Sequence, residues 1–96
     1  MLSKIPISLE RSADEDIDRE ILRAGIIAEL DAINLYEQMA ARVRDENIRR
    51  VLLDVAREEK THAGEFQALL LRNDSEQRDE LEKGRREVEE MMGALE

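Results

Sequence analysis

The residues best suited to chemistry are Glu59 and His62, which lie in the segment Glu58–Phe66 and include the chain's only histidine. In an α-helix, residues three apart share a face, so this spacing places a carboxylate beside an imidazole. Such a pair is half of the ligand set of a borderline or hard transition metal. Because Glu-x-x-His also arises by chance in acidic helices, the pair alone favours a solvated helix face over a metal site.

The segment that leads to this pair has a helical pattern over residues 46–72, with Asp45 as its expected N-cap. Its regular positions alternate at spacings of four and three, a heptad-like stripe that suits packing against another helix. Glu59 and His62 occupy two central positions of the stripe. The other positions are apolar: Ile48, Leu52, Val55, Phe66 and Leu69.

An earlier stretch, residues 13–44, has the same alternation and is interrupted in the same way. Ser12 and Glu15 have the form of a capping box, which predicts a helix start there. Glu29 stands in the middle of the stripe, and the other positions are apolar or amphipathic: Leu22, Ile26, Ile33, Tyr36, Ala40 and Val43. A carboxylate in an apolar stripe needs an explanation, because a buried charge is costly unless it is paired or bound to a metal.

A hairpin between the two stretches would bring the three polar residues together. If the chain turns back near Asp45, Glu29 lies about 16 residues before the turn, and Glu59 and His62 lie about 14 and 17 after it. At about 1.5 Å per residue, all three reach nearly the same height. The sequence therefore predicts a metal site made of Glu29, Glu59 and His62. For Tyr36, one further heptad along the first stripe, a site role and an ordinary core role remain equally open.

Composition limits the classes of fold and function. The chain has 96 residues, of which 41% are charged and 2% aromatic, with one proline and no cysteine. This profile is typical of helical bundles. The formal net charge of −9 makes nucleic acid an unsuitable partner and suits cations. Without cysteine there is no disulfide or thiolate site, and no apolar run approaches the roughly 20 residues of a membrane span. We expect a soluble intracellular protein.

The remaining segments complete a single domain over residues 1–96. Residues 1–11 have no helical period and are expected to be a lead-in. Residues 75–92 form a weaker helical pattern, with Asp74 as N-cap and Gln77 at the third helical position. This pattern has too few apolar residues for a core helix, so we expect a strap or an oligomer contact. Its apolar residues are Leu81, Val88, Met91, Met92 and Leu95.

The ligand count argues for assembly. One chain offers two carboxylates and one imidazole, which is an incomplete shell for a redox iron. A carboxylate-bridged di-iron bundle takes a glutamate from each of two helices and Glu-x-x-His from each of the other two. Two copies about a two-fold axis would supply that set. The predicted fold is all-α: an antiparallel two-helix hairpin plus a short C-terminal helix, with a ferritin-like four-helix bundle completed by dimerisation.

The runs at residues 29–36 and 58–62 resemble the encapsulated ferritin family, half-ferritins that are cargo of encapsulin nanocompartments. The resemblance implies that Glu29, Glu59 and His62 are iron ligands, with Glu59 bridging and Tyr36 close by. It also implies a ferroxidase centre formed by two chains and a ring of such dimers, usually a decamer. The family oxidises Fe(II) with oxygen and passes the product to the encapsulin shell, which implies a cytoplasmic location inside that compartment.

The chain departs from this family at two positions beside the motifs. Ala28 and Leu35 stand where members often carry an acid and an aromatic residue, which removes part of a secondary metal-attracting site, although Asp31 remains. The sequence also ends at Glu96 without the C-terminal tail that docks such cargo. We therefore expect either that the tail has been trimmed away or that the domain is delivered another way, for instance as a fusion.

Three other functions fit the same residues. The centre could reduce peroxide, as in rubrerythrin-like enzymes, and the choice of oxidant would separate this activity from a ferroxidase. A non-catalytic metal-binding or delivery module would hold iron without rapid turnover. A structural helical cargo or adaptor protein would bind no metal, and its polar stripe residues would only fix the helix register.

Overall fold

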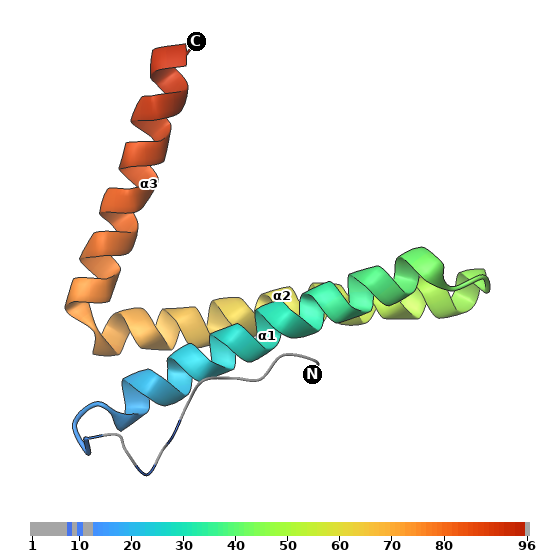
Figure 1. The fold of residues 1–96 in the computed structure, drawn as a ribbon, viewed down its shortest axis with the longest axis horizontal. Helices are drawn as coiled ribbons and strands as arrows, with labels where there is room; N and C mark the ends of the chain where they lie inside the picture. The colour runs from blue at the N-terminus through green and yellow to red at the C-terminus, as the bar shows by residue number, and fades with distance from the viewer. Residues whose placement is uncertain (1–7, 9, 11–12, 96) are drawn as a thin grey trace.

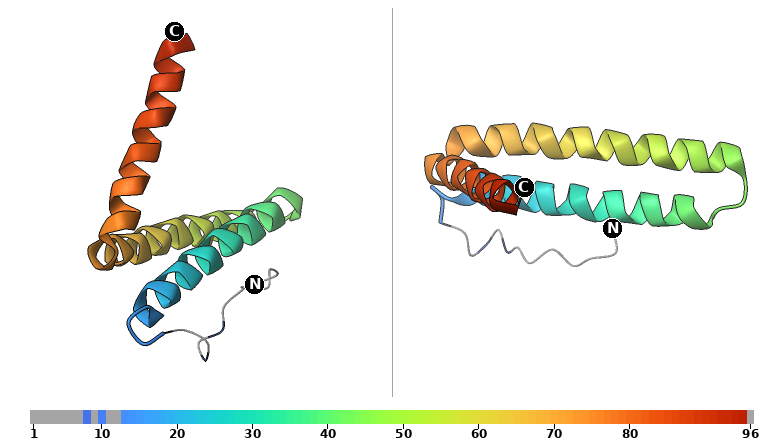
Figure 2. Two further views of the ribbon diagram at one scale, coloured as in Figure 1. Left: turned by 60° about the vertical axis from the view of Figure 1, so that its left-hand side comes forward. Right: turned by 90° about the horizontal axis from the view of Figure 1, so that it is seen from above.

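A computed structural model describes residues 8, 10 and 13–95 of the chain as three α-helices. These are α1 (Ile17–Arg42), α2 (Glu46–Asn73) and α3 (Ser75–Leu95), and the described part contains no strand. Helices α1 and α2 run antiparallel as a hairpin, and α3 projects away from it (Figures 1 and 2). The prediction of an all-α fold is confirmed. None of the described helices is both long enough and apolar enough to cross a membrane.

Helix α1 begins four residues later than the sequence pattern predicts. A turn closed by the Asp16 backbone N–H and the Ala13 carbonyl, at 2.9 Å, precedes the helix. Asp16 is the N-cap residue, but its side chain makes no capping hydrogen bond. Ser12, the expected capping residue, lies outside the described part of the chain, as do most of residues 1–11. The helix ends where Val43 adopts an extended conformation.

Side-chain caps define the starts of the other two helices. The Ile48 backbone N–H donates to Asp45 at 3.0 Å, and the Gln77 backbone N–H donates to Asp74 at 3.0 Å. Both interactions satisfy donors that have no partner within the helix, as the sequence predicts. Asp74 is the only residue between α2 and α3, and its extended backbone breaks the helical path. Helix α3 then continues to Leu95, three residues beyond its predicted end.

The packed face of α1 agrees with the predicted stripe. The packed face of α2 differs from its predicted stripe by one position over part of the helix. Ile33 and Ala40 are buried on α1, and Ala56 and Leu70 are buried on α2. Placing Ile48, His62 and Leu69 on the packed face was wrong, since Ile48 and Leu69 are 50% and 47% exposed and the His62 side chain is 46% exposed. The packed positions of α2 also alternate at three and four: Ala56, Glu59, Ala63, Phe66 and Leu70. The small side chains of Ala56 and Ala63 at two of these positions allow the helices to approach closely. The predicted stripe had instead selected positions with larger apolar side chains.

Gly25 on α1 marks the closest fit between the two helices. A Cβ atom at this position would lie 3.2 Å from Cδ2 of Phe66 on α2, whereas one at Gly84 on α3 would meet nothing within 4 Å. The Phe66 ring therefore occupies space that a side chain at position 25 would need. This contact lies one helical turn from Glu29, so it helps to fix the register in which the polar residues meet.

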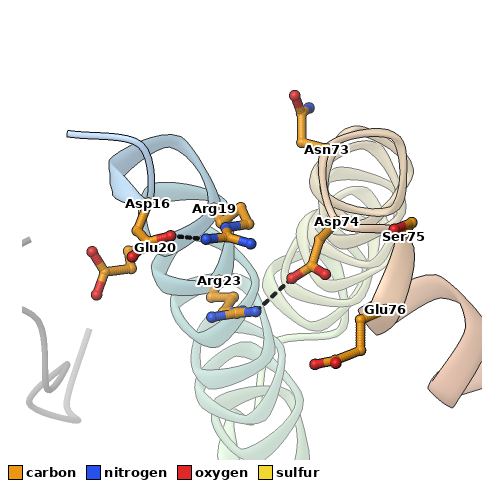
Figure 3. A pocket seen from close by; sticks show the side chains of 8 residues that line it. All are labelled: Asp16, Arg19, Glu20, Arg23, Asn73, Asp74, Ser75 and Glu76. Atoms are coloured by element: carbon orange, nitrogen blue, oxygen red, sulfur yellow. Dashed lines mark hydrogen bonds and ion pairs between the residues drawn. The ribbon is translucent and has the colours of Figure 1, made fainter. Parts of the chain in front are cut away.

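The junction of α2 and α3 is held to α1 by an ion pair. Arg23 donates to Oδ2 of Asp74 at 2.7 Å, and the Asp74 side chain is only 7% exposed. Figure 3 shows the two side chains pointing toward each other across the junction, with Arg19 directed to Asp16. The Gln77 backbone hydrogen bond, together with the positive charge of Arg23, lowers the pKa of Asp74 below its usual value. One carboxylate therefore both caps α3 and joins it to α1.

We predict that Gly25→Leu destabilises the hairpin by about 1–3 kcal/mol, because the new side chain must displace Phe66. The same substitution at Gly84 is the matched control, and it should not lower stability, because leucine is a better helix former than glycine and has room there. Thermal unfolding, followed by circular dichroism at one protein concentration, measures the change in stability of both variants. Equal effects at the two positions would contradict the close packing at Gly25.

We predict that Asp74→Asn lowers the Tm by a few degrees at pH 7, because asparagine can keep the cap but cannot pair with Arg23. A carboxyl whose pKa is depressed on folding stabilises the protein above its unfolded pKa, and this contribution is lost as the pH falls through the folded pKa. The Tm values of the two proteins should therefore converge in acid, as the pH falls through the lowered pKa of Asp74. Asp79→Asn, at an exposed position of α3, is the control. A Tm difference that persists unchanged in acid would refute the role of the ion pair.

Candidate metal centre

Glu29, Glu59 and His62 come together in the hairpin at the place where α1 and α2 face each other. One potential ligand atom from each lies within 4.8 Å of the other two. Nδ1 of His62 is 3.7 Å from Oε2 of Glu29 and 3.5 Å from Oε2 of Glu59. Glu29 comes from α1 and the other two residues from successive turns of α2. The structure thus brings together all three residues that were predicted, from their distance to the turn, to lie at the same height along the hairpin.

The three side chains differ in how far they are covered. Glu29 and Glu59 are 17% and 20% exposed, whereas His62 is 46% exposed. The carboxylates therefore lie in the packed layer between the helices, and the imidazole lies at its edge. The open side of the group is therefore at the imidazole. A further ligand could approach from this side.

The buried oxygen of Glu29 fits a cation. Its Oε2 atom is inaccessible to solvent and has no hydrogen-bond partner among the described residues, and 3.7 Å to His62 is too long for a hydrogen bond. An unsatisfied buried carboxylate oxygen is costly, and a bound cation would remove that cost. Oε2 of Glu20 is likewise buried without a partner, but among the residues that the structure describes it belongs to no group of potential ligands.

The donor set limits which ions fit. Two carboxylates and an imidazole suit iron, manganese and zinc, and no thiolate competes. Within the described part of the chain, these three residues are the only group with ligand spacing. Three side chains leave coordination positions open on most of these ions, which suits a site that exchanges ligands or is completed by a second chain.

Tyr36 lies outside this group. It is partly buried on α1, two turns beyond Glu29, which is about 10 Å along the helix axis. Its expected role near the centre stays a prediction. Asp31, Ala28 and Leu35 are partly buried on the same helix, whereas Glu58 and Glu65 are exposed on α2.

One interaction beside the site was missed by the sequence pattern. Lys60 pairs with Glu37 at 3.0 Å, joining α2 to α1 next to Glu59. Both residues look like ordinary solvated charges in the sequence, and only the register of the hairpin brings them into contact. This exposed ion pair joins the two helices beside the ligands.

Comparison with known proteins agrees with this geometry. A model of the rubrerythrin family matches residues 20–93. The crystal structure of the encapsulated ferritin domain from Pyrococcus furiosus superposes with a TM-score of 0.82 at 57% identity, covering 97% of both chains. The chain is an encapsulated ferritin-like domain of the rubrerythrin family. The resemblance drawn from the two motif runs is therefore confirmed.

Two relatives are longer than the region that this chain matches. The chain is 68% identical over 74 residues to a ferritin-like–encapsulin shell fusion protein of Pyrococcus furiosus, an alignment that covers 77% of this chain and 21% of the relative. It is 40% identical over 67 residues to an encapsulin nanocompartment cargo protein of Myxococcus xanthus, covering 70% of this chain and 51% of the relative. The chain thus spans about a fifth and about half of the lengths of these relatives.

We predict that Glu29→Gln leaves the metal-free protein as stable as the wild type or raises its free energy of unfolding by up to about 1 kcal/mol, because the variant removes a buried charge without a hydrogen bond. Added Zn²⁺, a redox-inert probe, should raise the Tm of the wild type and not that of the variant. Glu58→Gln, at an exposed carboxylate beside Glu59, is the control and should respond to zinc as the wild type does. A zinc shift retained in Glu29→Gln would exclude Glu29 as a ligand.

Proposed function

We propose that this domain is a ferroxidase that oxidises Fe(II) to Fe(III) with oxygen at a di-iron centre shared between two chains. The observation that supports it best is the meeting of Glu29, Glu59 and His62 within 4.8 Å, with a buried glutamate oxygen lacking a hydrogen bond. These residues are the proposed iron ligands. Iron is the substrate, and the same residues hold it while it reacts.

Two chains are needed for the proposed centre because one supplies only half of its ligands. Ferritin-like di-iron sites take a glutamate from each of two helices and Glu-x-x-His from each of the other two. Helix α1 supplies the first kind and α2 the second. A two-fold axis beside the exposed imidazole would double both, with Glu59 able to bridge the halves. The hairpin also leaves large apolar side chains exposed that such a dimer would cover, among them Ile21, Ile27, Leu30 and Met39.

Each proposed ligand has a part in the reaction. The carboxylates of Glu29 and Glu59 stabilise the higher charge of the product, which lowers the potential of the couple and favours loss of an electron. His62 must present an unprotonated nitrogen to bind, so binding competes with protons. Two Fe(II) ions held side by side would each lose one electron, and these two electrons with two protons from solvent would reduce oxygen to hydrogen peroxide. A carboxylate that can change from bridging to terminal binding would then allow the product to leave.

The names of the relatives support a proposal for the cellular compartment in which the domain works. Since one relative is an encapsulin cargo protein and another is fused to an encapsulin shell, we propose that this domain works inside an encapsulin compartment in the cytoplasm. The shell protein would be its partner, and the oxidised iron would be stored in the compartment. We further propose that the dimers join in a ring, with a decamer as the expected size.

A second function is favoured by one feature of the site. His62 lies near both carboxylates, so these contacts could fix the register of α1 and α2 without any metal. The domain would then be a structural cargo or adaptor protein, or a non-catalytic metal-binding module. Peroxide reduction at the same centre would be distinguished from the ferroxidase activity by comparing the rate of Fe(II) oxidation with peroxide and with oxygen as the oxidant.

We predict that His62→Ala and Glu59→Ala each abolish rapid Fe(II) oxidation, measured as Fe(III) absorbance after mixing anaerobic Fe(II) protein with oxygenated buffer. Loss of a ligand should reduce the rate by at least about a hundredfold, to near that of free Fe(II) in the same buffer. Glu58→Ala changes a neighbouring exposed carboxylate and should keep the wild-type rate. A wild-type rate in either ligand variant would refute the proposed centre.

Native mass spectrometry before and after anaerobic Fe(II) loading separates the two proposed functions. A shared centre requires even-numbered assemblies carrying about two irons per pair of chains. Even-numbered assemblies without bound iron would favour the structural protein. A monomer that binds one iron would contradict the shared centre.

A further inference from the structure

The ligand group lies between two apolar layers of the hairpin. Toward the turn, Ile33 and Ala56 are 8% and 2% exposed, and each is about one helical turn from a glutamate of the group. Away from the turn, the neighbouring layer contains Phe66, whose ring lies against Gly25. Access of water to the carboxylates therefore depends on how completely these two layers close.

The ring of Phe66 is directed toward the ligand group by the geometry of α2. Long side chains on a helix point back toward its N-terminus, which for Phe66 is the direction of His62 and the turn. Gly25, the residue that the ring meets, is one turn from Glu29 on the same face of α1. The Glu29 side chain leans toward Gly25 for the same reason. The ring and the carboxylate thus approach each other from the two helices.

The missing side chain at Gly25 makes room for the ring. A Cβ atom at this position would lie 3.2, 3.4 and 3.4 Å from Cδ2, Cε2 and Cγ of Phe66, so the ring would have to move. Glycine inside a helix is less stable than alanine, and Gly25 is well within α1. A Cβ atom at any of the other glycines would meet nothing within 4 Å: Gly64, Gly84 and Gly93. The close approach of the ring is therefore specific to the turn beside Glu29.

The atom that this cover affects is Oε2 of Glu29. It is inaccessible to solvent and has no hydrogen-bond partner among the described residues. A carboxylate oxygen that is already without water gives up no hydration when it binds a cation, and a low local dielectric strengthens the attraction. The apolar shell of a metal site controls solvent access and dielectric in this way. A ring that keeps water away from Glu29 would therefore raise the affinity of the group for a cation.

We propose that Phe66 is a positioning residue of the metal centre, which keeps water from Oε2 of Glu29 and holds this carboxylate toward the cation. The ring binds no metal ion and acts through Glu29. The proposal rests on the proposed metal site of Glu29, Glu59 and His62, but not on the oxidation of iron there. The affinity for any divalent cation that binds the site, and not only the rate of a reaction, should depend on the ring.

The experiment measures the affinity of the metal-free protein for Zn²⁺ by isothermal titration calorimetry. Phe66→Ala leaves space beside a polar atom, which water can enter, so the Kd should rise by roughly 10- to 100-fold. Leu70→Ala is the matched control, since Leu70 is 4% exposed on the same helix and lies about 12 Å along its axis beyond His62. It also removes a buried apolar side chain and should lower the Tm, but it should keep the wild-type Kd.

Two further variants keep the test sharp if Phe66→Ala does not fold. Phe66→Leu leaves a smaller space, so its Kd should lie between those of the wild type and the alanine variant. Adding Gly25→Ala to Phe66→Leu fills part of that space from α1, where a Cβ atom would replace the ring. The Kd of this double variant should return toward the wild-type value, because apolar cover is restored without the aromatic ring.

Three results would overturn the proposal: a wild-type Kd in both Phe66 single variants, an equal rise of the Kd in Leu70→Ala, or a double variant that keeps its helical circular dichroism without recovering affinity. A wild type that binds no zinc would overturn the metal site and this proposal with it.

Iron oxidation separates this proposal from the proposed function. All ligands remain in Phe66→Ala, so at saturating Fe(II) it should oxidise iron at close to the wild-type rate, with KM raised by the factor measured for Kd. If the wild type binds zinc with the expected dependence on Phe66 but does not oxidise Fe(II), the proposed function is wrong and the role of Phe66 stands.

Discussion

The structure depends on two carboxylates held in the packed layer of a hairpin only two helices thick. Glu29 and Glu59 occupy positions that would otherwise take apolar side chains, and one glutamate oxygen is buried without a hydrogen bond. A two-helix layer has little apolar burial with which to offset that cost. The packing around the carboxylates must therefore be close and well registered. The Phe66 contact at Gly25 meets this need on one side of the site, and the exposed Lys60–Glu37 ion pair joins the helices on the other.

The sequence was sufficient for the helices and for the meeting of the three polar residues, because both follow from spacing. The rise per residue is constant, so a turn near Asp45 places Glu29 opposite Glu59 and His62 whatever the details of packing. The exact packed face of α2 could not be obtained in this way. Two faces one position apart both alternate at three and four, and the choice between them depends on how Ala56 and Ala63 fit against α1. That fit is a property of the pair of helices.

Interactions between distant segments were also beyond the sequence pattern. Asp74 was identifiable as a cap from its own neighbours, since Gln77 lies three positions later. Its ion pair with Arg23, 51 positions away, appears only when the end of α2 lies beside the start of α1. The same limit applied at the other end of the hairpin. Arg49 donates to the Ala40 and Val43 carbonyls and so satisfies the C-terminal end of α1 from the following helix.

The half-exposed position of His62 connects the fold to the proposed chemistry. If the packed face of α2 included His62, the imidazole would be enclosed by α1, and a centre confined to one chain would have too few ligands to hold two metal ions. Because the packed face instead includes Ala63, His62 stands at the edge, where its ring can face a second copy. The displacement that the sequence pattern missed is therefore the feature that leaves the ligand group open to a partner. The proposed shared centre would make assembly a condition of activity, since a lone chain would hold its carboxylates in a costly state that a metal ion and a second chain would relieve.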